Sequence, residues 1–446
     1  MAKRYPSKSS EVMGSFQKTV DVVVAGSGPG GATIARGLAL AGKKVLVLEK
    51  GRWHKWLGNH LAALGYVDRA GMRRTVEGLN LVRGQTAGGS TILYCGAATE
   101  PPDWFKTDYG IKLGDYLQET IEQLNLVPLP DEVAGTASLR LLAAGDELGH
   151  GFQKFRKFID PLKCRSRCGG TCMLGCQYQA KWSARNYLTD MIEAGGELIT
   201  RAEVDRVTVQ DGVATGVTAK TARGDLEVKA ETVIISAGGL GTPFILQKSG
   251  IVEAGQGMCI DPLVFITGVS KHPGTCLGPP MSVGTYQYMD EGFILSDIID
   301  PWGLWPIMVI QENPAMLLNF LSYRRQLGLM VKVTDERKGS ISVKGPISKP
   351  LTDQDRARLD RGVKICKEIL IKAGCRPNSI MVGKVRGAHP MSTAPIGLVV
   401  DQNLQTRIPN LYVSDASVIP RSLGRPVVLT LICLAKRLTS HLLRNH

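Results

Sequence analysis

Residues 20–51 read VDVVVAGSGPGGATIARGLALAGKKVLVLEKG, and this stretch decides the fold of the chain. The apolar run at 20–25 predicts a buried strand that leads into a glycine-rich turn. After the turn, the pattern predicts a helix over about 30–41 and a second strand over 44–48. The stretch therefore predicts a βαβ unit close to the start of the sequence.

The glycines of this unit have the spacing of a dinucleotide-binding turn. Gly26, Gly28 and Gly31 form the pattern G-x-G-x-x-G, and Glu49 ends the second strand. Such a turn lets the backbone approach a pyrophosphate at the helix N-terminus, while a carboxylate at the second strand can hold ribose hydroxyls. A glycine triplet alone is weak evidence, but the flanking strand, helix and acid favour a dinucleotide site over a purely structural turn.

The bulk composition is that of an ordinary globular protein. The chain has 446 residues, of which 43% are hydrophobic, enough for two or three domains or one elaborate α/β unit. It contains no apolar run near the roughly 18 residues of a membrane span, and no hydrophobic core follows the basic, polar start. We therefore expect a cytoplasmic protein without a membrane span.

The charge balance is basic, with 54 Lys and Arg against 40 Asp and Glu and a formal net charge of +14. The basic residues are scattered and form no run of five or six, which favours a solvated surface over contacts with nucleic acid. A basic surface does suit an acidic partner, such as an acidic electron-transfer protein.

The rest of the chain alternates regular and irregular stretches. Residues 201–239 contain short β-like runs broken at turn residues, which predict a hairpin layer that returns to the parallel sheet. Residues 260–350 are rich in Pro, Gly and aromatics and predict a separate region of sheet and loop. Residues 351–374 predict an amphipathic helix with Thr352 as its N-cap.

Further motifs carry a resemblance to a known family. They are GQTAGGSTILYCGAATEPPDWF (84–105), VIISAGGLGTPFILQKSGI (233–251), GAHPMSTAPIG (387–397) and IPNLYVSDASVIPRSLGRPVVLTLICLAKRLTSHLL (408–443). With the N-terminal βαβ unit, their order along the chain resembles that of the glucose-methanol-choline (GMC) oxidoreductases, flavoproteins that oxidise alcohols.

The resemblance implies an α/β fold with two parts. A doubly wound, Rossmann-like FAD-binding domain would be assembled from residues 1–260 and 386–446, with a Cys-rich insertion at 160–180. A smaller α+β substrate domain with an antiparallel sheet would span residues 261–385. The second domain would roof a cavity for a small-molecule alcohol, completed, where it is open, by a partner subunit.

The resemblance also implies further FAD contacts beyond the N-terminal turn. Gly88, Gly89 and Ser90 would lie along the pyrophosphate and flavin edge, where small residues permit close approach. Asp415 would lie near the ribityl and phosphates, and the backbone near Val204 would meet the adenine. The remaining expected cofactor contacts are Ala237 and Pro426.

His389 matches the family's catalytic histidine. The expected reaction removes a hydroxyl proton while hydride leaves for flavin N5, and histidine suits the first task because its pKa lies near working pH. Two positions depart from the family pattern: Arg425 stands where Asn or His is usual, and Tyr94 stands where Asn is common.

Arg425 has two possible interpretations. Beside the reacting carbon it would stabilise an alkoxide or an anionic reduced flavin, or pair with a substrate carboxylate, and it would lower the pKa of a neighbouring histidine. Alternatively, it points away into a salt bridge and no second catalytic partner exists.

Cys164, Cys168, Cys172 and Cys176 occur at a strict spacing of four. On one helix the outer two would lie about 18 Å apart, whereas the ligands of one metal centre lie within roughly 4 Å of each other. The segment must therefore curl if the thiols share one centre, and Gly169, Gly170 and Gly175 permit this. Such thiols suit an iron-sulfur cluster, a structural zinc or disulfides.

Some GMC proteins carry a cysteine-bound iron-sulfur cluster in a comparable insertion, so the resemblance implies a cluster, [4Fe-4S] in type, held by all four cysteines, with zinc as the alternative. A one-electron relay would pass flavin electrons to an external acceptor instead of O₂. We therefore expect a dehydrogenase that acts on CH–OH groups. The alternative function is a flavin and iron-sulfur electron-transfer or reductase subunit of a larger complex.

Overall fold

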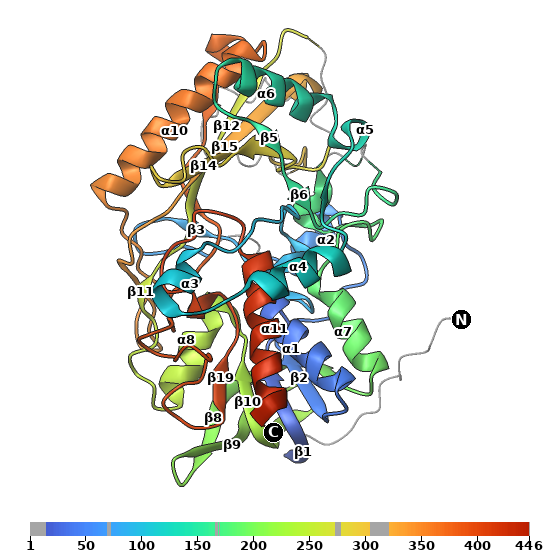
Figure 1. Ribbon diagram of the computed structural model, residues 1–446, viewed down its shortest axis with the longest axis vertical. Helices are drawn as coiled ribbons and strands as arrows, with labels where there is room; N and C mark the ends of the chain where they lie inside the picture. Colours follow the sequence, from blue (N-terminus) through green and yellow to red (C-terminus); the bar gives the residue numbers. More distant parts are fainter. Residues whose placement is uncertain are drawn as a thin grey trace.

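The computed structural model describes residues 15–68, 73–165, 168, 170–272, 278–303 and 321–445. These residues form an elongated molecule built around two main β-sheets (Figure 1). One sheet and its helices occupy the lower half of that view. The second sheet lies in the upper half with the helices α10 (Asp353–Lys372) and α6 (Thr136–Glu147).

The first sheet is parallel at its centre and antiparallel at one edge. Its strands lie in the order β7–β2–β1–β10–β9–β8, and β19 pairs in parallel with the end of β10. The strands are β1 (Phe16–Ala25), β2 (Val45–Glu49), β7 (Glu197–Thr200), β8 (Ala202–Gln210), β9 (Val213–Thr221), β10 (Gly224–Ile235) and β19 (Leu411–Val413). The βαβ unit and the hairpin layer predicted from the sequence are therefore both confirmed.

Helices pack against this sheet and bury its centre. β2 and the last four residues of β1 are buried throughout, as expected for central strands covered on both faces. Three helices pack together beside them: α1 (Pro29–Leu40), α7 (Ala184–Glu193) and α11 (Val428–Asn445). A Cβ added at Gly37 of α1 would lie 2.6 Å from Thr439 Cγ2 of α11. The small residue at position 37 thus lets the two helices approach closely.

The second sheet is mainly antiparallel, in the order β3–β18–β12–β15–β14–β13–β5, with β17 also paired to β12. Its strands are β3 (Asn80–Leu81), β5 (Gln153–Lys154), β12 (Pro262–Val269), β13 (Val283–Thr285), β14 (Phe293–Asp297), β15 (Gln326–Val333), β17 (Met381–Val382) and β18 (Arg386–Gly387). One face packs against α6 and α10. The α/β fold with a separate antiparallel sheet is confirmed.

The opposite face of the second sheet faces the rest of the molecule. Leu263, Phe265 and Met330 on this face form an apolar cluster against Ala97 and Ala388. Since β3, β5 and α6 also belong to this part of the fold, segments before residue 260 contribute to the second sheet. The division at 260/261 and 385/386 stays a prediction.

The amphipathic helix predicted over 351–374 is confirmed as α10. Its N-cap Thr352 accepts a hydrogen bond from the Asp355 backbone N–H, and the Asp355 side chain accepts one from the Thr352 N–H, which makes a capping box. No helix in the described part of the chain is long and apolar enough to cross a membrane.

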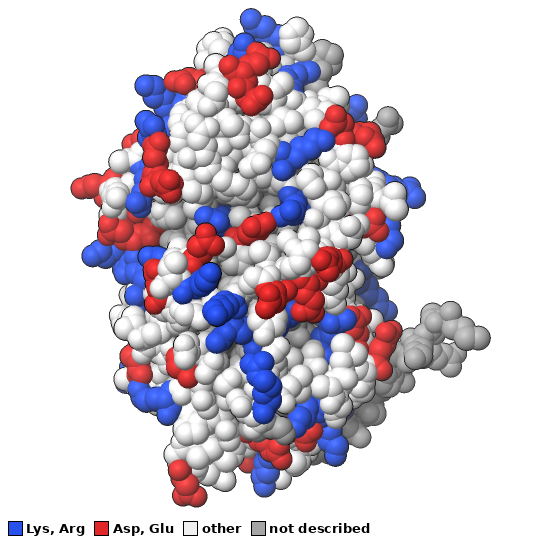
Figure 2. Space-filling view, in the orientation of Figure 1, with Lys and Arg blue, Asp and Glu red and all other residues white. Residues whose placement is uncertain are grey.

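Charged side chains are interspersed on the molecular surface. Figure 2 shows Lys and Arg mixed with Asp and Glu over both halves of the visible face, with no continuous basic stripe. This distribution agrees with the scattered basic residues of the sequence.

Candidate functional site

The turn between β1 and α1 leaves room for a ligand at one glycine only. A Cβ at Gly26 would lie 2.1 Å from Ser236 O, and one at Gly31 would lie 2.3 Å from Gly26 O, so both glycines are required by packing. A Cβ at Gly28 would meet nothing within 4 Å. Gly28 is also the N-cap of α1 and supplies no side-chain cap. The open space lies where a pyrophosphate would approach the helix N-terminus, so the turn fits a dinucleotide.

Glu49, at the end of β2, stabilises this turn by hydrogen bonds. Its carboxylate accepts hydrogen bonds from Ser27 N (3.1 Å), Ser27 Oγ (2.6 Å) and Gly51 N (2.6 Å). Burial raises the pKa of Glu49, although these hydrogen bonds oppose the shift. Glu49 therefore holds the shape of the turn, and its contact with a ribose stays a prediction.

The loop at 86–90 lies over the turn. Gly88 N donates to Ser27 Oγ at 3.1 Å, and a Cβ at Gly89 would lie 3.1 Å from Gly28 Cα. Both Gly88 (φ 87°) and Gly89 (φ 56°) have left-handed backbone conformations that favour glycine. Ser90 is exposed, and its Oγ accepts a hydrogen bond from Gly84 N. The predicted glycines thus form a narrow backbone cradle with Gly28.

The other expected FAD contacts lie around the same sheet. The Asp415 carboxylate accepts hydrogen bonds from the backbone N–H groups of Gly238 and Ser417 (both 2.8 Å) and from the hydroxyls of Thr242 and Ser417. It thereby anchors helix α8 (Gly238–Lys248), whose N-cap is Ala237. Burial raises the pKa of Asp415 against the effect of these donors. A direct contact of Asp415 with FAD stays a prediction.

Two further expected cofactor contacts, Val204 and Pro426, lie on β8 and just before α11. Val204 is buried on β8, and its neighbour Glu203 forms an exposed ion pair with Lys50, which follows β2 (2.7 Å). Pro426 is buried just before α11. Both stay predicted cofactor contacts.

His389 lies in a dyad with Asp261, which the sequence analysis missed. His389 Nδ1 donates to Asp261 Oδ2 at 2.9 Å, and Asp261 Oδ1 accepts from Ser422 Oγ (2.5 Å) and Gly424 N (3.0 Å). Asp261 is fully buried directly before β12, while 22% of the His389 side chain is exposed. Because Nδ1 carries the proton in this bond, Nε2 has the free lone pair of a base.

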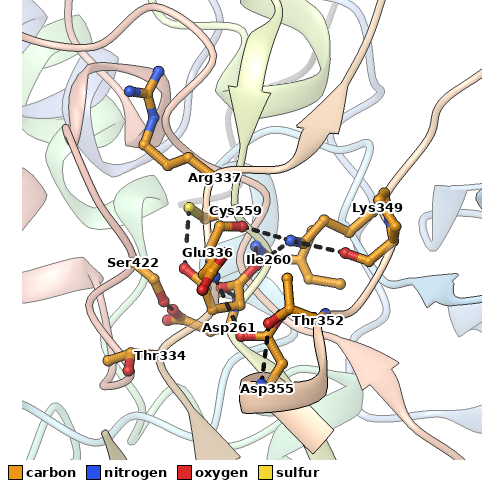
Figure 3. Close-up of polar contacts among 12 residues, drawn as sticks. Cys259, Ile260, Asp261, Thr334, Glu336, Arg337, Lys349, Thr352, Asp355 and Ser422 are labelled. Atoms are coloured by element: carbon orange, nitrogen blue, oxygen red, sulfur yellow. Dashed lines mark hydrogen bonds and ion pairs between the residues drawn. The ribbon is translucent and has the colours of Figure 1, made fainter.

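A buried network of polar groups fixes the position of Asp261; Figure 3 shows Asp261 with Ile260, Ser422 and Lys349. Asp335 accepts hydrogen bonds from the backbone N–H groups of Ile260 and Asp261, both at 3.0 Å. Lys349 Nζ lies 3.0 Å from Asp335 Oδ2, and neither side chain is exposed. Burial raises the pKa of Asp335 to about 6, and the Lys349 ammonium opposes this shift. The backbone at Asp261, directly before β12, is therefore hydrogen-bonded to the buried Asp335–Lys349 ion pair.

Burial lowers the pKa of His389, and the nearby Lys332 ammonium lowers it further; the Asp261 contact opposes both effects. In one of the two interpretations of its position, Arg425 was expected to supply this repulsion, whereas the cation whose charge lowers the pKa of His389 is Lys332 on β15. Burial and the Lys332 charge thus both favour the neutral imidazole that a base requires. A lone lysine within the buried run QLGLMVKV was the available sequence signal.

Arg425 is half-buried and has few contacts. Its Nη1 lies 3.4 Å from Glu100 O, and its buried Nε has no hydrogen-bond partner in the structure. Burial lowers the pKa of Arg425, while Tyr286 and Asp261 oppose this effect. Within the described ranges we find no salt bridge that would hold Arg425 away from a ligand. Tyr94, in contrast, donates its hydroxyl proton to Trp182 O at 2.9 Å, so this side chain is already engaged.

The cysteine segment is curled and not an α-helix. A short 3₁₀ turn covers Thr171–Leu174, and Gly170 (φ 71°) and Gly175 (φ 96°) have left-handed conformations. Gly169 lies outside the described residues. Cys172 is buried, and Cys164 and Cys176 pack against a small apolar cluster. The expectation that the chain curls is confirmed for the described part of this segment.

The described thiols are not arranged as the ligands of one metal centre. Among the described residues, no group of three or more His, Cys, Asp or Glu side chains is placed to hold a metal ion. Cys168 and Cys172 share a hydrogen bond, which lowers the pKa of Cys168 to about 6. Burial, together with the neighbouring Cys168 and Cys176, raises the pKa of Cys164 to about 12.

Two buried lysines flank the cysteine segment. Lys157 Nζ donates to the carbonyl oxygens of Cys95, Pro280 and Met281, and Lys181 Nζ donates to those of Ile92, Tyr94 and Cys172. Burial lowers the pKa of Lys181 to about 8, and the nearby thiols Cys172, Cys95 and Cys176 oppose this shift. Neither ammonium forms an ion pair with a carboxylate among the described residues. Carbonyl dipoles alone compensate two buried charges only in part.

A cavity of about 530 Å³ adjoins the same segment. It lies between the loop at 53–59 and the start of α7 and is lined in part by Cys176, Lys181 and Arg185. His389 and Asp261 do not line it, so it is separate from the dyad.

Comparison with known proteins supports the resemblance. A family model described as GMC oxidoreductase matches in two parts, residues 66–263 and 347–435, which together make up well over half of the chain. An uncharacterised GMC-type oxidoreductase of Mycobacterium tuberculosis is 29% identical over 406 residues, covering 84% of this chain and 63% of the relative. The chain thus spans less than two thirds of the length of that relative.

Other relatives differ in length. An uncharacterised protein of Methanocaldococcus jannaschii is 28% identical over 426 residues, covering 95% of this chain and 100% of the relative. A long-chain-alcohol oxidase of Arabidopsis thaliana is 24% identical over 399 residues, covering 79% of this chain and 52% of the relative.

Two solved structures share the fold. Pyridoxine 4-oxidase from Mesorbium loti superimposes with a TM-score of 0.71 at 16% identity and covers 96% of this chain and 100% of that one. Formate oxidase from Aspergillus oryzae gives a TM-score of 0.69 at 16% identity, with 96% and 99% coverage. With the two-part family match, these likenesses show that the chain belongs to the GMC oxidoreductase family.

Proposed function

We propose that this protein is an FAD-dependent oxidoreductase that acts on CH–OH donors. The observation that carries the proposal is the His389–Asp261 dyad in a fold whose Gly28 turn leaves open space for a dinucleotide. The names of the relatives support the donor class, since they include a long-chain-alcohol oxidase and pyridoxine 4-oxidase.

In this reaction, separate groups of residues bind the cofactor and remove the proton. Gly26, Gly28 and Gly31 form the turn for the pyrophosphate, and the loop at 86–90 covers it. When bound, FAD supplies the two-electron acceptor that takes the hydride from the carbinol carbon. His389 Nε2 takes the hydroxyl proton, so one proton and one hydride leave the alcohol together.

Two neighbouring groups support this proton transfer. Asp261 keeps the His389 ring in the tautomer whose Nε2 is unprotonated, and it stabilises the imidazolium that forms. Arg425 presents N–H donors that are not saturated by the described protein atoms, and these would stabilise a developing alkoxide.

We also propose that an iron-sulfur cluster, bound by the four cysteines, relays electrons from the flavin. Its support is electrostatic: the ammonium groups of Lys157 and Lys181 are buried near the thiols and form no ion pair with a described carboxylate, although the charge of the buried Asp297 also acts on Lys157. An oxidised [4Fe-4S] core with four thiolates carries a net charge of about −2, which two lysines would balance. Zinc with four thiolates carries the same charge, so zinc stays the alternative. The described thiols would have to move closer together in either case.

Anaerobic purification with assays of flavin, iron, zinc and acid-labile sulfide per chain tests both parts. One FAD per chain supports the first part, and its complete absence overturns it. About four iron and four sulfide per chain support the relay. Zinc without sulfide overturns the relay and leaves the alcohol chemistry intact.

The external acceptor can be tested on the same preparation. If the relay operates, the alcohol-reduced enzyme passes electrons to a one-electron acceptor such as ferricenium faster than to O₂. An enzyme that contains flavin and cluster but is reduced by no alcohol, only by another redox protein, would instead be a reductase subunit.

A further inference from the structure

Lys332 is the exception among the buried lysines of this protein. Among the described residues, the buried lysines are Lys157, Lys181, Lys332, Lys349 and Lys436. Lys157 and Lys181 each donate to carbonyl oxygens, Lys349 pairs with Asp335, and Lys436 pairs with Glu119. For Lys332, which is 2% exposed, we find no hydrogen bond or ion pair with any described residue. Lys332 Nζ is not one of the described polar atoms that are both fully enclosed and unpaired, so the side chain is buried but its ammonium has open space beside it, where an anion can bind.

The sheet register places Lys332 on the face opposite to α6 and α10. Lys332 pairs with Leu263 of β12 and with Ile294 of β14. It lies two residues from Met330, and side chains two residues apart share one face of a strand. Leu263 and Met330 belong to the apolar cluster that contacts Ala388. Lys332 therefore lies on the same face of the sheet as the cluster that contacts Ala388, the residue directly before His389.

The strand register brings Lys332 close to the dyad, because its partner Leu263 on β12 lies two residues after Asp261. The charge effects agree with this placement: the Lys332 ammonium lowers the pKa of His389, and the Asp261 carboxylate opposes the lowering of the Lys332 pKa by burial. The Asp261 carboxylate, however, is already taken by His389, Ser422 and Gly424. Arg425 has the carboxylates of Asp103 and Glu100 near it as well as that of Asp261, so Lys332 is the cation of this site that lacks an anionic partner of its own.

We propose that Lys332 is a specificity-determining residue that binds an anionic group of the substrate, and that the substrate is an alcohol bearing a carboxylate. The proposal rests on the CH–OH oxidation proposed above. An ammonium–carboxylate contact in this apolar surrounding would fix the substrate at one end, while its hydroxyl meets His389 at the other.

A ligand titration of the oxidised holoenzyme tests the proposal without turnover. Butyrate and its neutral analogue butyramide are titrated separately, and the change in the flavin absorbance spectrum gives each Kd. We expect butyrate to bind about tenfold or more tightly than butyramide in the wild type. In Lys332→Met the two should bind within about threefold of each other, whereas Lys332→Arg should keep most of the preference.

Controls separate this role from a structural one. Lys436→Met removes another buried lysine, whose partners are Glu119 and Gln123 and not the dyad, and should keep the wild-type preference. Arg425→Met tests the other cation: a preference lost there but kept in Lys332→Met would overturn the proposal. Equal binding of butyrate and butyramide by the wild type would overturn it as well, even if Lys332→Met fails to fold.

Turnover gives a second readout. With 4-hydroxybutyrate and 1-butanol as the matched pair, Lys332→Met should raise KM for the hydroxy acid about tenfold or more. Its kcat should change little at alkaline pH, where His389 is neutral with or without the Lys332 charge. A flavin-containing enzyme that prefers 1-butanol refutes the role of Lys332 and leaves the proposed function standing. An enzyme without flavin refutes the proposed function first.

Discussion

Replacement of Asp261 by Asn tests the dyad most sharply, because it changes charge and proton placement while keeping size. Asp261 Oδ1 accepts hydrogen bonds from Ser422 Oγ and Gly424 N, so the amide oxygen of Asn should take this position. The amide N–H₂ would then face His389 Nδ1, which must accept instead of donate. The His389 proton moves to Nε2, and the lone pair of the base is lost.

The expected loss can be bounded from two sides. A hydrogen bond to a charged group contributes about 1.5–3 kcal/mol, which corresponds to a rate factor of roughly 10 to 150. When the same change also imposes the wrong tautomer on a catalytic histidine, as in a Ser-His-Asp protease, the loss reaches about 10⁴-fold. We therefore expect Asp261→Asn to slow flavin reduction by about 10²- to 10⁴-fold.

The assay is anaerobic stopped-flow reduction of the bound flavin by the best alcohol of a substrate panel. Ser422→Ala is the matched control, since it removes one donor to Asp261 but leaves the carboxylate and its bond to His389 intact; we expect less than about a tenfold loss. Flavin content and thermal stability are measured in both variants. An Asp261→Asn enzyme with full flavin content that reduces within threefold of the wild-type rate would refute the assigned role.

Three further outcomes follow from the structure. Gly28→Ala should fold with near wild-type Tm but lose bound flavin, whereas Gly31→Ala should lower Tm because its Cβ would collide with Gly26 O; equal flavin content in both variants would contradict this difference. Lys349→Met should lower the free energy of unfolding by about 3–5 kcal/mol, measured by urea denaturation, because Asp335 is left buried without its cation. For pH, the pKa of His389 lies below its ordinary 6.5, so kcat/KM should be constant at neutral pH and fall only as the solution is acidified through that lowered pKa; a fall that begins above pH 7 would contradict the assignment.

Local patterns were sufficient to predict much of the fold. The strand, turn and helix at the N-terminus, the hairpin layer and the capped α10 each depend on residues close together in sequence, and all are found. The pairing of β5 with β13 and of β3 with β18 was not predictable in this way, because a two-residue strand carries no periodic signal. Such strands are defined only by the sheet that they join.

The functional site was predicted only in part, because its contacts join residues that lie far apart in the sequence. His389 lies in a recognisable motif, but its partner Asp261 is 128 residues away and carries no pattern beyond a single acid before a strand. Lys332 is likewise a single charge in an apolar strand. Arg425 was singled out by its departure from the family, yet the charge that acts on His389 comes from Lys332. Contacts of this kind depend on tertiary packing, which the sequence pattern does not encode locally.

The central claim is that the His389–Asp261 dyad removes a proton from an alcohol beside a bound flavin. Its most direct test mixes the purified flavoprotein with an alcohol panel without oxygen and follows the bleaching of the oxidised flavin, in the wild type and in His389→Asn. We predict that at least one alcohol bleaches the wild-type flavin and that His389→Asn, with equal flavin content, does so at least about 100-fold more slowly. Bleaching at equal rates in both proteins would contradict the account.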